Sequence, residues 1–257
     1  MKNVLALLYN FPPANSMGSI RAARLLPRLE EHGLRFQVVT IEERFISHPN
    51  PRALEEMGDR ISISRTGMLD FEGKARRLLS AVLNKLPARP EHRPEEAIPE
   101  GALDTSFKMW IRRWFLLPDQ QMGWIPYAYR AGAKLLDEQK FDLILSSAPP
   151  FSGAIAAALL QRRSGLPWVM EFRDAWSRFD IHPERYSAFR RAFIRRLERS
   201  LAGRMHSVIT LSEAIATDLV TKYPELATKT VTVHNSFEPS RYRGVGPDPG
   251  KFRIVHT

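Results

Sequence analysis

Short apolar runs alternate with amphipathic segments along most of this chain, and this alternation restricts the possible folds more than any other feature. Several runs are almost continuously apolar, as expected of strands buried on both faces. The predicted strands are residues 4–9, 36–41, 61–64, 143–146, 168–172, 207–211 and 230–234. Strands alternating with helices predict an α/β fold with a Rossmann-like, doubly wound, mostly parallel sheet.

Helical patterns lie between most of these runs. The predicted helices are residues 20–32, 124–138, 153–163, 187–202 and 213–222. Several follow a residue type that favours the start of a helix, such as Ser212 before Glu213. Ligands of open parallel sheets bind beyond the carboxyl ends of the strands, so we expect the functional residues in the loops that follow the strands.

Three segments do not follow the alternation of strands and helices, and their compositions predict how the chain is divided into domains. Residues 67–121 interrupt it as a helical and loop insertion, and residues 237–251 are dense in proline and glycine, as interdomain linkers are. Residues 252–257 have the composition of a strand. We therefore expect one large domain at 1–236, a linker at 237–251, and at 252–257 the first strand of an absent C-terminal domain.

The amino-acid composition limits which cellular compartment the protein can occupy and which disulfide or metal chemistry it can carry. The chain contains no cysteine, which excludes disulfides and thiolate metal sites, and none of its seven histidines has metal-binding spacing. We therefore expect no metal. The N-terminal apolar run is too short for a signal peptide, and the longest apolar run, residues 151–160, is too short to span a bilayer. A cytoplasmic protein, soluble or lying on a membrane surface, is expected.

The loop after the first strand is a candidate binding site for an anion. Gly18 and Ser19 lie where this loop meets the first helix, and Arg21 follows in the first helical turn. A glycine lets a ligand approach the backbone, and a helix N-terminus attracts negative charge. An ordinary strand-to-helix turn explains the same residues. Neither the glycine fingerprint of dinucleotide-binding proteins nor the phosphate-binding loop of nucleotide hydrolases is present.

Charged residues also follow the fifth predicted strand. Arg173 and Asp174 come directly after the apolar run 168–172, where they could hydrogen-bond sugar hydroxyls. A simple Arg–Asp pair that closes the loop is the alternative. After the fourth strand, Ser147 lies among small residues that leave room for a ligand, but no nucleophile-elbow motif surrounds it.

These motifs occur together in an order found in one enzyme family. They are the Pro-Pro…Gly18 loop and its helix, residues 36–40, 141–150, 165–176, 208–212 and 231–235. In this order the chain resembles the N-terminal domain of family 4-type glycosyltransferases with the GT-B fold, in the subgroup that makes bacterial surface polysaccharides such as lipopolysaccharide.

The resemblance implies two Rossmann-like domains that face each other across a cleft. The C-terminal domain binds the nucleotide-sugar donor, the N-terminal domain binds the acceptor, and transfer retains the anomeric configuration without a metal.

The resemblance also implies roles for single residues. Gly18 and Ser19 would line the diphosphate, Arg21 would lie nearby, and Arg173 and Asp174 would face the acceptor. Asp174 is the candidate catalytic residue. The remaining substrate-binding candidates are Ser147, Ser212, which is most simply a helix cap, and Asn235. No histidine role transfers, because Ser147 and Ala148 stand where many members have one.

A basic surface is the last feature, in a chain of net charge +10. The predicted helix at 187–202 carries Phe189, Phe193, Leu197 and Leu201 at four-residue spacing, with arginines around the rest of its surface. Basic amphipathic segments with tryptophan suit an anionic membrane surface, although the phenylalanines could instead pack on the sheet. The predicted membrane-facing residues are Trp110, Arg112, Arg113, Trp114, Arg190, Arg191 and Arg195.

The preferred hypothesis is therefore the acceptor-binding half of a retaining glycosyltransferase at the cytoplasmic face of a membrane. Its partners would be a nucleotide-sugar donor, a lipid-linked glycan acceptor and anionic lipid. Two alternatives remain open. A pI of about 10.1 also fits a nucleic-acid-binding protein, though no RNA- or DNA-binding motif is present. A Rossmann scaffold also fits a nucleotide-dependent oxidoreductase, though the glycine fingerprint is missing.

Overall fold

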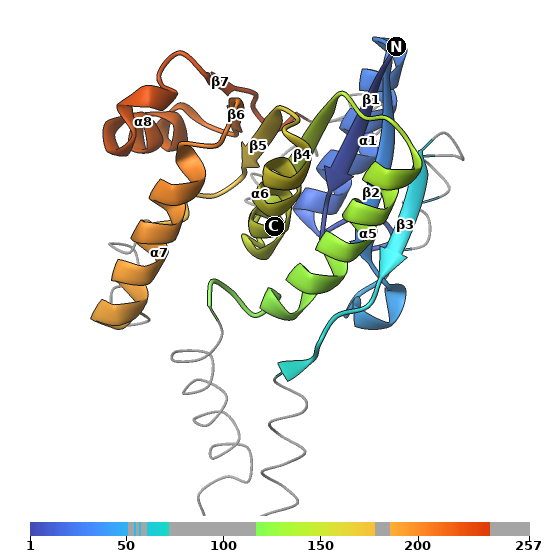
Figure 1. Cartoon of the computed structure of the whole chain (residues 1–257), viewed down its shortest axis with the longest axis horizontal. Helices are drawn as coiled ribbons and strands as arrows, with labels where there is room; N and C mark the ends of the chain where they lie inside the picture. The colour runs from blue at the N-terminus through green and yellow to red at the C-terminus, as the bar shows by residue number, and fades with distance from the viewer. Residues whose placement is uncertain (51–53, 55–56, 58–60, 72–116, 178–185, 237–257) are drawn as a thin grey trace, which may run out of the picture.

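The computed structural model describes residues 1–50, 54, 57, 61–71, 117–177 and 186–236. Within these ranges, all strands belong to one parallel sheet in the order β3-β2-β1-β4-β5-β6-β7 (Figure 1). The predicted α/β, Rossmann-like fold is confirmed, because every strand overlaps a predicted apolar run. The strands are β1 (Lys2–Leu7), β2 (Leu34–Ile41), β3 (Ser62–Thr66), β4 (Leu143–Ala148), β5 (Trp168–Phe172), β6 (Ser207–Thr210) and β7 (Thr230–Thr232).

All five predicted helices are also present, with ends that differ by a few residues. They are α1 (Met17–Glu31), α5 (Ile125–Glu138), α6 (Ser152–Ser164), α7 (Ala188–Ala202) and α8 (Glu213–Lys222). The largest difference is at α1, which begins three residues earlier than predicted. The Ser16 hydroxyl accepts a hydrogen bond from the Ser19 N–H and so fixes the helix start at Met17.

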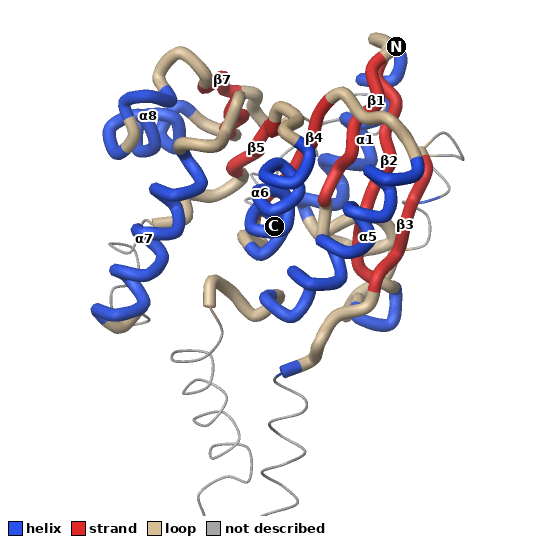
Figure 2. Tube along the Cα trace, viewed as in Figure 1, coloured by secondary structure: helices blue, strands red, loops and turns tan. Residues whose placement is uncertain are grey.

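Both faces of the central strands are buried, which explains their continuous apolar sequences. Along β1, Leu5 and Leu7 contact the core beneath α5 and α6, whereas Val4 and Ala6 contact the core beneath α1. Successive side chains of a strand point to opposite faces, so one strand contributes to two cores. Figure 2 shows α5 and α6 on one side of the sheet and α1 on the other.

A buried carboxylate connects the segment before α5 to the carboxyl end of β4. Asp119 accepts hydrogen bonds from the Ser152 N–H (2.9 Å) and the Ser152 hydroxyl (2.5 Å), and so caps the N-terminus of α6. Burial raises the pKa of Asp119, while these hydrogen bonds oppose the shift. The cap holds α6, and the loop before it, at the edge of the sheet where the strands end.

Helix α7 differs from the prediction at one of its three arginines that were expected to face a membrane. Arg190, predicted to face a membrane, is buried, and its Nη2 donates to the Pro118 carbonyl (3.0 Å). The prediction for Arg190 is therefore wrong, because this side chain is buried inside the domain in a hydrogen bond to Pro118. Arg191 is half-buried and donates to the Tyr186 carbonyl, and Arg195 is exposed.

Several predictions concern residues outside the described ranges and stay predictions. These are the membrane-facing Trp110, Arg112, Arg113 and Trp114, most of the insertion at 67–121, the linker at 237–251 and the strand at 252–257.

None of the helices in the described ranges combines the length and the apolar character that crossing a bilayer requires.

Candidate functional site

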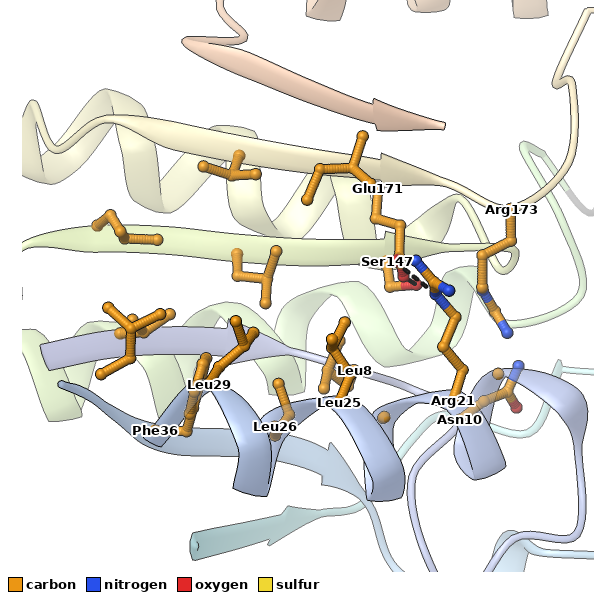
Figure 3. Close-up of a pocket in the computed structure, with 18 residues that line it drawn as sticks. Leu8, Asn10, Arg21, Leu25, Leu26, Leu29, Phe36, Ser147, Glu171 and Arg173 are labelled. Atoms are coloured by element: carbon orange, nitrogen blue, oxygen red, sulfur yellow. Dashed lines mark hydrogen bonds and ion pairs between the residues drawn. The ribbon is translucent and has the colours of Figure 1, made fainter. Parts of the chain in front are cut away.

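The carboxyl ends of β1, β4 and β5 meet at the point where the sheet changes its direction of winding. From β1 the chain passes through α1 to β2 on one side, while β4, on the other side of β1, is followed by α6 on the opposite face. Ligands of doubly wound sheets bind at such a point because the loops on either side diverge. Three of the predicted residues, Arg21 on α1, Ser147 in β4 and Arg173 after β5, lie near it (Figure 3).

Arg173 covers the N-terminal turn of α1. Its Nη2 donates to the Pro149 carbonyl in the loop after β4, and its backbone N–H donates to the Ala148 carbonyl (2.8 Å). A Cβ atom at Gly18 would overlap the guanidinium, so this placement requires glycine. Burial lowers the pKa of Arg173, while the carboxylates of Glu171 and Asp174 oppose the shift. Arg173 therefore places a half-buried cation at the positive end of a helix.

The sequence prediction for Gly18 and Ser19 changes accordingly. The guanidinium of Arg173 lies over Gly18, so a ligand meets this side chain before the glycine backbone. Ser19 is fully buried, and its N–H is occupied by the Ser16 hydroxyl. In this conformation Ser19 presents no polar group to a ligand.

A buried ion pair beside Arg173 links α1 to the sheet. Arg21 Nε lies 2.9 Å from Glu171 Oε1, and both side chains are only 10% exposed. The Ser147 hydroxyl donates to Glu171 Oε2 (2.5 Å). The pairing of β4 with β5 places Ser147 directly opposite Glu171, so both side chains point to the face covered by α1. Figure 3 shows Arg21 reaching from α1 to this pair.

Arg21 also holds the segment that follows β7. Its Nη1 donates to the His234 carbonyl (3.1 Å) and to Asn235 Oδ1 (3.3 Å), and its Nη2 donates to the Val233 carbonyl (3.1 Å). Four of the predicted residues, Arg21, Ser147, Arg173 and Asn235, thus meet around Glu171. Ser212 has a different role, because its hydroxyl accepts from the Ile215 N–H as the N-cap of α8.

Glu171 was missed as a site residue by the sequence analysis. The available signal was one carboxylate inside the otherwise apolar run 168–172. A buried carboxylate needs a partner, and the arginines after β1 and β5 were the candidates.

Asp174 lies exposed on a loop that is fixed on both sides. Before it, Arg173 is held by the loop after β4; after it, the Trp176 ring stacks on Phe151 at 4.2 Å between centroids and an angle of 2°. The next residue, Ser177, accepts a hydrogen bond from Lys222 Nζ on α8 (3.0 Å). The carboxylate is therefore presented to solvent at the edge of the sheet by a loop with little freedom to move.

A buried carboxyl on α7 lies beneath the same loop. Glu198 is 1% exposed, and its Oε2 accepts from the Tyr223 hydroxyl (3.0 Å). Burial raises the pKa of Glu198 above its ordinary 4.5, while hydrogen bonds from Ser177 and Tyr223 oppose the shift. The stability that the neutral carboxyl contributes is therefore complete below the unfolded-state pKa and is lost as the pH rises through the folded-state pKa.

We expect the free energy of unfolding to fall more steeply in the native protein than in Glu198→Gln as the pH is raised from below 4.5 toward neutral. The amide keeps an oxygen for Tyr223 but does not ionise. Urea unfolding at a series of pH values measures the difference. Glu138→Gln, an exposed exchange on α5, should follow the native profile. Parallel profiles for Glu198→Gln and the native protein would contradict the assignment.

Two hollows open near this edge. One, of about 240 Å³, lies between α1 and the sheet; its walls are apolar, and Arg21, Glu171 and Arg173 lie among its lining residues. The other, of about 270 Å³, is more polar and lies between the loops after β1 and β2. Its lining includes Tyr9, Asn10, Asn15, Phe45, His48 and Gln121, which combine aromatic rings with amide and imidazole groups. None of these residues is among the site residues predicted from the sequence.

Within the described ranges, no group of three histidine, aspartate or glutamate side chains is arranged to hold a metal ion.

Comparison with known proteins gives a family and a fold. The family described as "Glycosyl transferase 4-like domain" matches residues 18–236. The HepE protein of Anabaena, solved in complex with UDP-glucose, aligns with a TM-score of 0.50 and 15% identity over 94% of this chain and 46% of that one. A glycosyltransferase from Rickettsia africae ESF-5 aligns with a TM-score of 0.45 and 9% identity, over 96% of this chain and 47% of that one.

The likeness to HepE supports the same fold, that of GT-B glycosyltransferases. This chain spans about half the length of these solved structures. No curated protein sequence matches it.

Proposed function

The chain belongs to the glycosyl transferase 4-like domain family, and from this premise we propose that it is the acceptor-binding half of a retaining glycosyltransferase. The enzyme transfers a sugar from a nucleotide-sugar to a lipid-linked or polysaccharide acceptor. The observation that carries the proposal is the placement of Arg173 on the first turn of α1, beside an exposed carboxylate, at the switch point of the sheet. The family match favours sugar transfer over nucleic-acid binding or oxidoreduction.

In this proposal the donor diphosphate lies against Arg173, which the family resemblance had assigned to the acceptor, because its guanidinium lies over Gly18. The complex of HepE with UDP-glucose supports a nucleotide-sugar donor. The Arg173 guanidinium and the N-terminal end of the α1 dipole both favour an anion. Negative charge develops on the diphosphate as the sugar leaves, and these groups stabilise it without a metal. The ion pair between Arg21 and Glu171 holds α1 in place beneath them.

The acceptor faces Asp174 and the polar hollow. The exposed carboxylate accepts a hydrogen bond from an acceptor hydroxyl and so orients that oxygen toward the donor. The hollow offers amide groups at Asn10, Asn15 and Gln121 for sugar hydroxyls, with Phe45 as an apolar face. Burial raises the pKa of Tyr9 to about 12, with Asp119 adding to the shift, so its phenol stays protonated.

Asp174→Ala is expected to lower kcat/KM for sugar transfer by about 10- to 100-fold, the loss that follows removal of a hydrogen bond to a charged group. Thermal stability should stay unchanged, because the side chain is exposed. The assay uses the full gene product with UDP-glucose and lipid-linked acceptors. We expect no turnover from the isolated 257-residue chain.

Asp137→Ala is the matched control, since Asp137 is an exposed aspartate at the end of α5. Its activity should equal that of the native protein. Native turnover in Asp174→Ala would remove Asp174 from the site. Absence of transfer from any nucleotide-sugar would overturn the proposed function itself.

The proposed acceptor indicates where in the cell the protein works. A lipid-linked glycan is held at a membrane, so we propose that the protein works at the cytoplasmic face of the cell membrane as a peripheral enzyme of surface polysaccharide synthesis. The basic composition supports this location, because anionic lipid attracts clustered arginines.

A further inference from the structure

The first half of α7 carries an exposed aromatic pair that the sequence analysis placed on the same face as Leu197 and Leu201. Phe189 is 60% exposed and Phe193 is 38% exposed, and their ring centroids lie 6.4 Å apart. The helix is instead anchored through another face, where Ile194, Glu198 and Leu201 are buried. Two large apolar rings side by side in water are an unfavourable arrangement unless something covers them.

The charge around this pair is positive. Arg196 and Arg199 are exposed on α7, while its one acidic residue, Glu198, is buried. The surface of the helix therefore presents cations and aromatic rings, and α7 itself contributes no exposed carboxylate. Its first turn lies on the side of the molecule toward which β1 and β3 point, the side of the candidate site (Figure 1).

We propose that this face of α7 docks on an anionic lipid bilayer, with Phe189 and Phe193 at the interface and Arg196 and Arg199 against the headgroups. Amphipathic helices with aromatic and basic residues bind such surfaces through combined apolar burial and charge attraction. Nucleic acid is a less suitable partner, because single-stranded sites combine aromatic platforms with a basic groove, and neither hollow described above includes a residue of α7.

Docking by this face extends the proposed function, and the biological role of the docking rests on that function. It brings the loops after β1, β4 and β5 close to a membrane, where a lipid-linked acceptor is found. Lipid binding itself does not require sugar transfer, so the two proposals can fail separately.

Vesicle sedimentation of the 257-residue chain tests the proposal. We expect binding to vesicles of phosphatidylcholine mixed with phosphatidylglycerol, weaker binding at high salt, and little binding to phosphatidylcholine alone. Phe189→Ala with Phe193→Ala should weaken binding to the anionic vesicles by about tenfold, and Arg196→Glu by about fivefold or more. Circular dichroism of each variant verifies the fold.

Matched controls lie on α6. Leu159 is 42% exposed, so Leu159→Ala removes an exposed apolar side chain elsewhere, and Arg162→Glu reverses an exposed charge elsewhere. Both should bind vesicles like the native chain.

The absence of cysteine allows a direct readout of insertion. An environment-sensitive fluorophore attached at Phe193→Cys should shift to the blue with anionic vesicles, whereas the same label at Leu159→Cys should not. Failure to bind anionic vesicles, or equal binding after loss of both phenylalanines, overturns the proposal. So does displacement of the chain from vesicles by single-stranded DNA that requires Phe189 and Phe193.

Discussion

Gly18→Ala is expected to lower kcat/KM for sugar transfer by about 100-fold, the typical loss when one group that stabilises a developing anion is removed. The added Cβ atom would overlap the guanidinium of Arg173. Gly18 and Ser19 of α1 are buried, and the atoms that the new Cβ would meet are the far end of the long Arg173 side chain, so this side chain is the part that moves. It then loses its hydrogen bond to the Pro149 carbonyl and its place at the helix N-terminus.

Stability should change little in the same variant. Alanine favours a helix over glycine by about 1 kcal/mol, which offsets part of the strain. Steady-state kinetics of the full gene product and thermal unfolding of the chain measure the two effects. Gly203→Ala is a suitable control, because a Cβ atom at Gly203 meets nothing within 4 Å.

A double-mutant cycle shows whether the loss of activity in Gly18→Ala comes from displacement of Arg173. In the Arg173→Ala background the guanidinium is absent, so Gly18→Ala should have no further effect on kcat/KM. Additive losses in the double variant would show that Gly18 acts without Arg173, and the proposed placement of the diphosphate would then be wrong.

Glu171→Ala is expected to reduce the free energy of unfolding by about 3 kcal/mol, because it leaves Arg21 buried without its partner. Both side chains of this pair are only 10% exposed, so solvent screens the lost interaction little. The Ser147 hydroxyl loses its acceptor as well. Urea unfolding measures the change, and the melting temperature should fall by about 10 °C for a domain of this size.

The control is the exposed pair between Arg163 and Asp137, whose side chains are 45% and 63% exposed. Asp137→Ala should leave the unfolding transition almost unchanged, because water screens this pair. Removing Arg21 together with Glu171 should destabilise less than the sum of the single changes. A native-like unfolding curve for Glu171→Ala would show that the pair contributes nothing to the junction of α1 and β5.

The sequence predicted the sheet and the helices because their signals are local. The apolar runs at β1, β4 and β5 and the polar–apolar period of α5 and α8 depend on residues a few positions apart. The order of elements then fixed the fold class, and with it the edge of the sheet at which Gly18, Arg173 and Asp174 would lie.

The tertiary structure decided which side chains meet. Glu171 lies opposite Ser147 because β5 pairs with β4 in one register, and Arg21 reaches Glu171 from a helix 150 residues earlier in the chain. No local pattern contains that pairing. It also decided the orientation of α7, where the sequence left open whether Phe189 and Phe193 pack on the sheet or face a membrane.

Burial of Arg190 and Glu198 on α7 instead depends on groups supplied by distant segments. The Pro118 carbonyl accepts from Arg190, and the Tyr223 hydroxyl donates to Glu198. A polar side chain can be buried when a partner satisfies it, so the preferred face of a helix is set by its neighbours as well as by its own apolar residues. The sequence by itself therefore determined where the strands and helices lie and which edge of the sheet carries the candidate site. Only the packed structure determined the contacts at that edge and the face that α7 leaves exposed.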